Sequence, residues 1–376
     1  MSNSSVAPVA ILASFSGSGG VERMLVHLLH GLTALDVPVE LLTLRTTSPF
    51  LAALPASIPQ ISLGTAHSLL AIPALARYLR QRRPRLLLAA KERAGRSAVS
   101  ARALAGVNTP IALRLGTHLS AALAGRSAWQ RWLRTAPLPW LYRPLEAIVA
   151  VSAGVKDDVA TLARFDPERI HIIRNPTIPP DIEQQAQAPC LHPWCQERTM
   201  PLIVAAGRLE RQKDFATLIT AIAQLRRQQR CRLLIAGEGS ERKALEQQIA
   251  SLGLSDVVQL PGFFPNLYPY LARAELFVLS SAWEGAPNVL VEALALGTPV
   301  VATDCPSGPH EILAAGRWGP LVPVGDASAL ARAMAQTLAR PLPATQLRAA
   351  VSEYTQERST QCYLALFNQL IAQGRG

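Results

Sequence analysis

Residues 275–304 read ELFVLSSAWEGAPNVLVEALALGTPVVATD. The apolar run at 275–280 predicts a buried strand, residues 281–287 a loop, and the next stretch a helix that leads to a second apolar strand at 298–304. A strand, a crossover helix and another strand form the βαβ unit of a parallel sheet. This stretch therefore indicates an α/β fold.

The same alternation of strand, Gly/Ser/Asp-rich loop and amphipathic helix recurs along the rest of the chain. The first unit is VAILASF, then SGSGG, then the helical pattern VERMLVHLLHGL. Strands that alternate with helices in this way predict parallel sheets. The other predicted strands are 9–15, 37–44, 85–90, 110–115, 146–151, 169–174, 201–207, 232–239 and 257–262.

The length of 376 residues exceeds what one hydrophobic core usually organises, so two domains are expected. The segment 176–201 is rich in Pro and Gln and has little periodicity, which is typical of an interdomain linker. We therefore expect a first domain at 1–178 and a second at 179–355. Residues 356–376 predict a terminal amphipathic helix.

The composition is that of a globular protein, with 49% hydrophobic and 17% charged residues. The formal net charge of +11 favours an anionic partner, which a membrane surface, a phosphorylated substrate or a nucleic acid could provide. Nucleic-acid binding rests on this charge alone, because the sequence has no helix-turn-helix, zinc-finger or aromatic RNA-binding pattern.

Five cysteines, an odd number, lack the regular spacing of a disulfide framework and indicate a reducing compartment. The stretch CLHPWCQ, with Cys190, His192 and Cys195, lacks a second ligand pair for zinc, so its cysteines are expected to be linker residues. The N-terminal apolar run is expected to be a strand rather than a signal peptide, and no apolar run is long enough to span a bilayer. We expect a cytoplasmic protein, either soluble or peripheral on the inner face of the cytoplasmic membrane.

Two carboxylates flank the predicted helix start in the opening stretch. Glu284 lies in the loop and Glu292 in the helix, while Asn288 is a good N-cap and the N–H groups of the next two residues form an anion site. Such a pair can hold vicinal hydroxyls on either side of a phosphate. The alternatives are acid/base catalysis and a glutamate that only stabilises the helix dipole.

A pair of cations follows the predicted strand at 201–207. Arg208 and Lys213 could clamp a diphosphate and stabilise the charge that develops on a leaving group. No D-x-D motif for a divalent metal is present, so we expect no metal and no cofactor. The alternative is that both side chains are solvated surface cations.

Several motifs together resemble the retaining GT-B glycosyltransferases called family 4. They are SGSGGVERM, GRLERQKDFATLI, LLIAGEGSERKALEQ and VQLPGFFPNLYPYLARAELFVLSSAWEGAPNVLVEALALGTPVVATD, and the match is most specific at about residues 205–313. The resemblance implies two facing Rossmann-like domains with parallel sheets. It also implies that the acceptor domain comes first, the donor domain second, and that the C-terminal helix crosses back to the first domain.

The resemblance assigns roles to matching positions. Arg208 and Lys213 would contact the donor diphosphate, Glu292 the ribose hydroxyls and Glu284 the transferred sugar, and His118 would lie near the reacting centre. The family is thought to react on one face of the sugar, so Glu284 would position the sugar without acting as nucleophile or general base. Other residues expected to contact or line the donor site are Gly19, Gly20, Gly237, Glu238, Phe263 (near the base), Gly285, Ala286, Pro287, Asn288, Val289.

The expected function is transfer of a sugar from a nucleoside diphosphate donor, with UDP as the favoured nucleotide. The acceptor would be a glycan or a lipid-linked molecule in cell-envelope polysaccharide or lipopolysaccharide synthesis. The alternatives are a sugar-nucleotide epimerase or a phosphorylase of the same fold. Tryptophans among arginines could also contact an anionic membrane, although an ordinary solvated loop would have the same composition; these residues are Arg126, Trp129, Arg131, Trp132 and Arg134.

Overall fold

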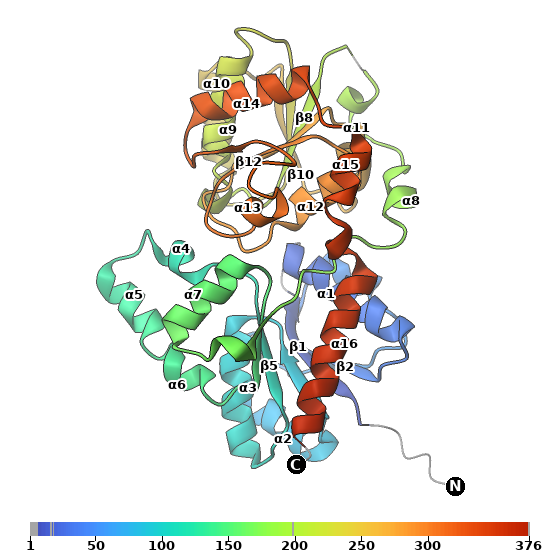
Figure 1. Cartoon of the computed structure of the whole chain (residues 1–376), viewed down its shortest axis with the longest axis vertical. Coiled ribbons are helices and arrows are strands. Elements are labelled where there is room, and N and C mark those ends of the chain that lie inside the picture. Colours follow the sequence, from blue (N-terminus) through green and yellow to red (C-terminus); the bar gives the residue numbers. More distant parts are fainter. Residues whose placement is uncertain (1–6, 16, 18, 198, 375–376) are drawn as a thin grey trace. The chain divides into compact units, whose positions relative to one another are not determined.

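The computed structural model describes residues 7–15, 17, 19–197 and 199–374 (Figure 1). The chain divides into two compact units, of which the first comprises Met1–Pro176 with Gln356–Gly376 and the second Thr177–Thr355. The expected domain boundary, between residues 178 and 179, lies two residues further along the chain. Each unit is an α/β domain built on a parallel sheet.

In the first unit, the described residues form a seven-stranded parallel sheet with the order β3-β2-β1-β4-β5-β6-β7. Each of its central strands is buried on both faces, which explains their continuous apolar sequences. The strands are β1 (Val9–Phe15), β2 (Val39–Thr46), β3 (Gln60–Ser62), β4 (Leu86–Ala89), β5 (Ile111–Leu115), β6 (Ala147–Ala150) and β7 (Ile170–Ile172).

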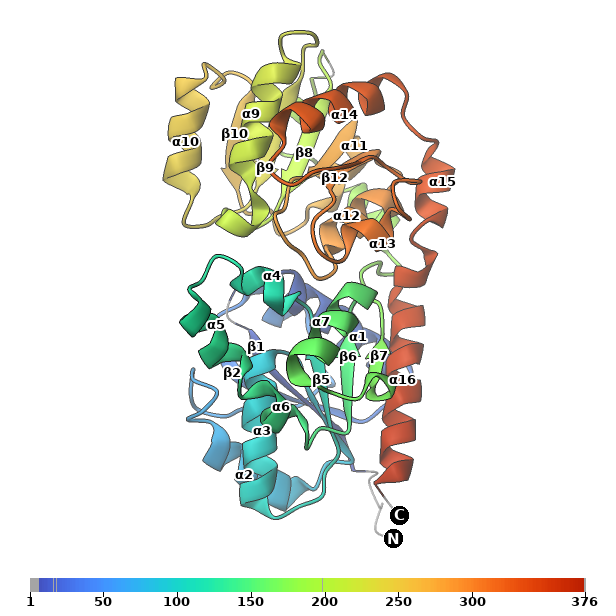
Figure 2. The same ribbon diagram turned by 60° about the vertical axis from the view of Figure 1, so that its left-hand side comes forward.

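Helices cover both faces of this sheet, as the two views in Figures 1 and 2 show. Helices α1 and α16 pack together on one face, where Tyr363 and Phe367 of α16 join the core beside β1 and β4. The predicted terminal helix is therefore part of the first unit. The helices are α1 (Gly20–Ala34), α2 (Ile72–Arg82), α3 (Glu92–Ala105), α4 (Leu119–Leu123), α5 (Ala128–Thr135), α6 (Leu138–Tyr142), α7 (Ala153–Ala163) and α16 (Gln356–Gln373).

The described residues of the second unit form a six-stranded parallel sheet with the order β10-β9-β8-β11-β12-β13. Its strands are β8 (Leu202–Ala206), β9 (Arg232–Ala236), β10 (Val258–Gly262), β11 (Leu276–Leu279), β12 (Val300–Thr303) and β13 (Leu321–Val322). Its helices are α8 (Ile182–Ala186), α9 (Phe215–Leu225), α10 (Arg242–Ser251), α11 (Tyr268–Arg273), α12 (Asn288–Ala295), α13 (Pro309–Ile312), α14 (Ala327–Ala339) and α15 (Ala344–Ala349).

Alternate residues of the central strand β8 divide the core of this unit between two layers. Leu202 and Val204 contribute to the layer that contains α8, α11, α12 and α15, whereas Ile203 and Ala205 contribute to the layer with α9, α10 and α14. This alternation follows from the period of two in a strand. The sheet is therefore enclosed by helices on both faces.

Every strand predicted from the sequence is present, and the fold class is confirmed. The strands that the apolar pattern did not predict are the two edge strands β3 and β13. Strand β3 has three residues, none of them fully buried, and β13 has two residues. Short, half-exposed edge strands carry too few apolar residues to produce a pattern.

The prediction of a linker at 176–201 is wrong. This segment belongs to the second unit and contains α8 and a short 3-10 helix at Pro193–Cys195. Trp194 is 9% exposed and packs in the core layer of α11 and α12, where the Arg232 guanidinium lies 5.1 Å from the centre of its ring. Its apolar side chains are widely spaced among Pro and Gln, so periodicity alone did not reveal their burial.

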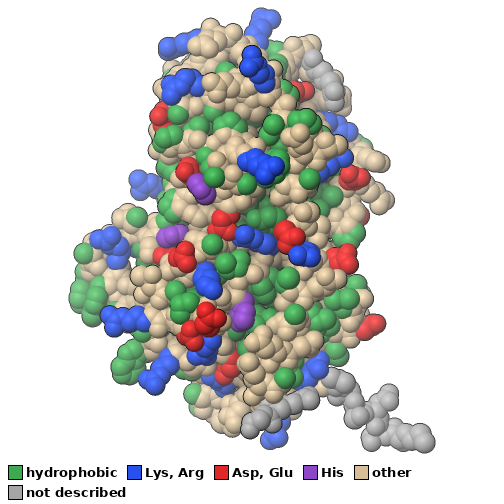
Figure 3. Space-filling view, in the orientation of Figure 1, with side chains coloured by type: hydrophobic (Ala, Val, Ile, Leu, Met, Phe, Trp, Pro, Cys, Tyr) green, Lys and Arg blue, Asp and Glu red, His purple; other side chains and the backbone are tan. Residues whose placement is uncertain are grey.

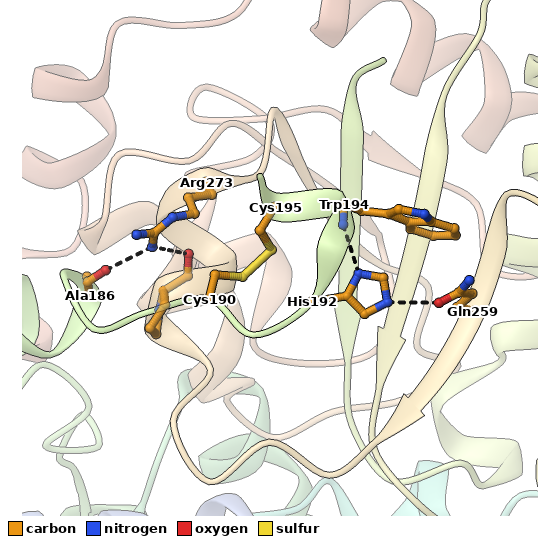
Figure 4. Close-up of a disulfide and its surroundings, with 8 residues drawn as sticks. Ala186, Cys190, His192, Trp194, Cys195, Gln259 and Arg273 are labelled. Carbon is orange, nitrogen blue, oxygen red and sulfur yellow. Dashed lines mark hydrogen bonds between the residues drawn. A yellow bond between two sulfur atoms is a disulfide. The ribbon is translucent and has the colours of Figure 1, made fainter. Parts of the chain in front are cut away.

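Cys190 and Cys195, expected to be linker residues, form a disulfide within the second unit (Figure 4). The ring of His192, between them in sequence, accepts or donates a hydrogen bond at 2.8 Å to the side chain of Gln259. Within the described residues no group of three or more His, Cys, Asp or Glu side chains is placed to hold a metal ion. The other cysteines are unpaired, and Cys231 and Cys305 are buried.

None of the helices in the described part of the chain combines the length and apolar character that crossing a membrane requires.

Candidate functional site

The second unit brings most of the candidate donor-site residues to one edge of its sheet. Residues 207–213 follow β8, residues 237 and 238 follow β9, Phe263 follows β10, and the loop at 280–287 follows β11. Because the strands are parallel and adjacent in the sheet, their carboxyl ends meet at the same edge. Ligands of open α/β sheets bind at this edge.

An ion pair joins the loops after β8 and β11. The Lys213 ammonium lies 2.5 Å from Oε1 of Glu284, and the same oxygen accepts a hydrogen bond from the Ser281 hydroxyl at 2.7 Å. The Glu284 side chain is 8% exposed and that of Lys213 is 15% exposed. Because water is largely excluded from this ion pair, both charged groups are held in fixed positions. Fixed charges of this kind can hold a polar ligand.

The backbone holds these two loops together as well. The Ala282 N–H donates to the carbonyl of Gln212 at 2.8 Å, and the Ser280 hydroxyl donates to the carbonyl of Lys213 at 2.7 Å. The backbone at Lys213 is therefore held by the loop after β11 as well as by its own 3-10 helix, Arg211–Lys213.

Two glycines allow the loops after β8 and β9 to approach closely. A Cβ atom at Gly237 would lie 1.9 Å from the carbonyl oxygen of Gly207, and the φ of Gly237 is +148°. A Cβ atom at Gly207 would in turn lie 2.8 Å from Cε of Lys213. Only glycine fits at both positions, because a side chain at either would displace the lysine or the loop that carries it.

Helix α12 begins one residue earlier than the sequence predicts, because a capping Asn288 would place the first helical residue at Val289. Pro287 is the N-cap, Asn288 is the first helical residue, and the Asn288 side chain accepts a hydrogen bond from the Thr177 hydroxyl at 3.3 Å. The Leu290 N–H, predicted to be free for an anion, donates to the Pro287 carbonyl at 3.1 Å. The capping prediction is wrong because Pro287 has the extended backbone of the cap position itself.

Glu292 lies in α12 and is 2% exposed. Its assignment to the ribose hydroxyls of the donor stays a prediction. Arg208 is different, since its side chain is 59% exposed and pairs with the exposed Glu210 at 3.0 Å. The exposed carboxylate of Glu238 pairs with Arg242 at 2.6 Å, and this hydrogen bond lowers the pKa of Glu238. Arg208 is thus the more exposed of the two predicted diphosphate ligands.

The structure adds residues that the sequence did not single out. Ser281 is 0% exposed and holds Glu284, while Ser307 donates to the carbonyl of Gly285 at 2.9 Å. Burial and the nearby charge of Glu284 raise the pKa of Cys305 to about 12, so this thiol stays protonated. Serines beside a functional loop carry no distinctive spacing, and no sequence signal could have separated them from ordinary loop residues.

In the first unit, Gly19 is the N-cap of α1 and Gly20 its first residue, whereas Ser16 and Ser18 of the same loop lie outside the described residues. His118 is the N-cap of α4, where its Nδ1 accepts from the Ala121 N–H at 3.4 Å.

The Asp158 carboxylate lies 3.5 Å from Nδ1 of His118 and accepts the Leu119 N–H at 2.6 Å. Asp158, which the sequence did not indicate, therefore holds the start of α4 next to His118.

The tryptophans and arginines predicted to contact a membrane lie on and beside α5, a helix in which no residue is buried. Trp129 and Trp132 are 63% and 55% exposed, and their rings stack with centroids 4.9 Å apart. We call the exposed residues Arg126, Trp129, Arg131, Trp132 and Arg134 the Trp/Arg surface. In Figure 3 hydrophobic and basic side chains lie together on this side of the first unit.

Comparison with known families agrees with this architecture. Residues 18–178 match the model "Glycosyltransferase Family 4", and residues 196–358 match "Glycosyl transferases group 1". The two family models and the paired parallel-sheet units together define a glycosyltransferase of the GT-B class. The chain belongs to the family 4, group 1 glycosyltransferases.

Curated relatives include bacterial glycosyltransferases. The chain is 36% identical over 171 residues to the lipopolysaccharide core biosynthesis glycosyltransferase LpsE of Rhizobium meliloti, which is 44% of this chain and 49% of the relative. It is 33% identical over 190 residues, half of each chain, to the N-acetylgalactosamine-N,N'-diacetylbacillosaminyl-diphospho-undecaprenol 4-alpha-N-acetylgalactosaminyltransferase of Campylobacter jejuni. The matches thus span about half the length of these relatives.

Solved structures share the whole fold at low sequence identity. A glycosyltransferase from Rickettsia africae superimposes with a TM-score of 0.77 at 17% identity, covering 98% of this chain and 99% of the other. HepE of Anabaena, solved in complex with UDP and glucose, superimposes with a TM-score of 0.71 at 21% identity, covering 98% and 99%. These similarities establish the GT-B fold.

Proposed function

We propose that the protein is a retaining glycosyltransferase that moves a sugar from a UDP-sugar to a glycan or lipid-linked acceptor of the bacterial cell envelope. The observation that carries the proposal is the buried Lys213–Glu284 pair at the carboxyl edge of the second sheet. The names of the relatives, which act in lipopolysaccharide core synthesis and on a diphospho-undecaprenol acceptor, support the envelope role. The complex of HepE with UDP supports the choice of nucleotide.

In the proposed reaction the bond between the sugar C1 and the diphosphate oxygen breaks, and a bond from C1 to the acceptor hydroxyl oxygen forms on the same face. The acceptor's proton passes to the departing diphosphate. Lys213 and Arg208 stabilise the negative charge that develops on this diphosphate. Such electrostatic stabilisation is usually the largest single contribution to lowering the activation barrier. Glu284 holds sugar hydroxyls and Glu292 holds the ribose.

This chemistry needs no metal, because Lys213 and Arg208 would take the place of a divalent cation on the diphosphate. Transfer is therefore expected to proceed at an undiminished rate in excess EDTA. A loss of activity that added Mg²⁺ or Mn²⁺ restores would contradict this part of the proposal.

Binding of UDP-sugars is expected to stabilise the protein against thermal unfolding. A ligand at about 100 times its Kd adds about 2.7 kcal/mol to the free energy of unfolding, which raises Tm by several degrees. Thermal unfolding should be measured with UDP-, GDP- and ADP-sugars, and the UDP-sugars should give the largest shift. Equal shifts from all three bases, or none, would contradict the proposed donor.

The Trp/Arg surface is proposed to contact an anionic membrane that presents a lipid-linked acceptor. Tryptophans favour the bilayer interface, and each nearby arginine gains about 1 kcal/mol at an anionic surface, an attraction that salt screens. The protein should sediment with anionic vesicles at low salt and much less with neutral ones.

Two double variants test which residues bind the membrane. Trp129→Ser with Trp132→Ser should abolish sedimentation with anionic vesicles, whereas Arg227→Gln with Arg230→Gln, two exposed arginines of the second unit, should reduce it little. Equal sedimentation with neutral and anionic vesicles would refute the contact.

A further inference from the structure

A cavity of about 810 Å³ lies in the first unit, at the carboxyl ends of its central strands. Its wall includes Ser14 at the end of β1, Lys91 after β4 and Leu115 at the end of β5. Residues of α6 and α7 add apolar side chains, among them Leu138 and Val159. The cavity thus occupies the position where a parallel α/β sheet binds ligands, and it is formed within this unit alone.

The charges around the cavity do not balance. Four cations line the cavity: Lys91, Arg93, Arg96 and Arg114. Three carboxylates lie near them, those of Glu92 and Asp158 in the wall and that of Glu22 beside Lys91.

The three carboxylates are already engaged. Glu22 pairs with Lys91 at 2.9 Å, Glu92 pairs with Arg96, and Asp158 accepts N–H groups at the start of α4. Within the described residues Arg93 and Arg114 are left without a carboxylate. Arg93 is exposed to solvent, so the uncompensated charge inside the molecule is that of Arg114.

Arg114 is 2% exposed and makes fewer hydrogen bonds than its donors allow. Its Nη2 donates to Oδ1 of Asn175 at 2.7 Å, whereas Nε and Nη1 have no acceptor in good hydrogen-bond geometry among the described residues, and the Tyr363 hydroxyl lies near the guanidinium. A Cβ atom added to Gly116, another residue of the cavity wall, would lie 2.8 Å from Nη1. Nη1 therefore lies at the wall of the cavity.

A buried guanidinium without a counter-ion is costly, because desolvation penalises its charge and unsatisfied donors add to the cost. Burial accordingly lowers the pKa of Arg114, and the nearby Tyr363 and Glu22 oppose that change. An anion in the cavity would supply the missing acceptors and the missing negative charge. Planar guanidinium groups bind carboxylates and phosphates especially well.

We propose that this cavity binds an oxyanion group of the acceptor, a phosphate or a carboxylate, and that Arg114 is its principal ligand. The assignment to the acceptor rests on the proposed transferase function, whereas the anion site itself does not. The mixed wall, with cations near β4 and β5 and apolar side chains from α6 and α7, suits an anionic sugar whose ring faces are apolar.

The test measures thermal unfolding of the full chain with inorganic phosphate and, separately, with glucuronate, against KCl of equal ionic strength. At concentrations about ten times Kd, a bound anion should raise Tm by about 2 °C or more. A larger shift with phosphate indicates a phosphorylated acceptor, and a larger shift with glucuronate indicates an acidic sugar.

Two variants assign the shift to Arg114. Arg114→Gln removes the charge, and Asn175→Asp keeps the arginine but places a carboxylate where the Asn175 oxygen lies 2.7 Å from Nη2. The second variant neutralises Arg114 internally, so it should fold even where Arg114→Gln does not. Both should lose the anion-induced shift, whereas Arg230→Gln, a matched loss of an exposed arginine in the second unit, should keep it.

The same variants separate this site from the donor site. Asn175→Asp should retain the shift induced by UDP. An anion shift that survives in Asn175→Asp, or no shift in the wild type, would overturn the proposal, and so would a UDP shift lost together with the anion shift. An anion shift that depends on Arg114 in a protein without donor binding would support the site and refute the transferase.

Discussion

Replacement of Lys213 by alanine is expected to lower kcat/KM for sugar transfer by about 1,000-fold or more. Removal of one group that stabilises developing negative charge typically costs about 100- to 1,000-fold in rate. Lys213 should lie at the upper end, because it also holds Glu284. The measurement is steady-state release of UDP in the presence of the acceptor.

Arg211→Ala is the matched control, since Arg211 lies in the same 3-10 helix as Lys213 but is exposed. It should retain kcat/KM within a few-fold, because Arg211 is exposed and no contact with the donor is proposed for it. Arg208→Ala and Glu292→Ala should also abolish transfer in folded protein. Wild-type turnover in Lys213→Ala, Arg208→Ala and Glu292→Ala would refute the roles proposed for these residues.

The loss in Lys213→Ala must be separated from a loss of stability. Removing one partner of a buried ion pair leaves the other charge unpaired, which costs about 3–5 kcal/mol in fully buried cases and less here, where Lys213 is 15% exposed. The double variant Lys213→Ala with Glu284→Gln removes that unpaired charge. It should recover most of the lost stability and none of the activity.

The sequence predicts the central strands well because each is a continuous apolar run. That signal exists only where a strand is buried on both faces, so it fails for β3, which has no fully buried residue. It fails also for the segment 176–201, where Trp194 and the cysteines are buried by contacts with α11 and α12 that are remote in sequence. The composition of this segment predicts a linker, but its tertiary contacts make it part of the hydrophobic core of the second unit.

For the candidate site, motif order predicts which loops follow which strands, and the parallel sheet then brings them to one edge. Pairwise geometry is not contained in that order. The Lys213–Glu284 pair joins residues assigned to different parts of the donor, and Asp158 beside His118 has no motif at all. Arg114 looks like an ordinary strand residue until the fold buries it.

Replacement of Gly237 by alanine is expected to destabilise the second unit by about 3 kcal/mol or more and to abolish UDP binding. The added Cβ atom would lie 1.9 Å from the Gly207 carbonyl oxygen, which belongs to the backbone and cannot rotate away. Severe overpacking typically costs about 1–3 kcal/mol, and the φ of +148° adds backbone strain for any L-residue. The loop after β8 must therefore shift, and it carries Lys213.

The control for backbone strain alone is Gly253→Ala. Gly253 also has a positive φ, +66°, but no atom lies within 4 Å of its added Cβ. It should cost only about 1 kcal/mol and leave UDP binding unchanged. Urea unfolding and UDP-induced thermal shifts of the two variants measure both effects. Equal losses of stability in the two variants would mean that the close contact between the β8 and β9 loops adds nothing to the effect of backbone strain. Unchanged UDP binding in Gly237→Ala would show that this contact does not support the donor site.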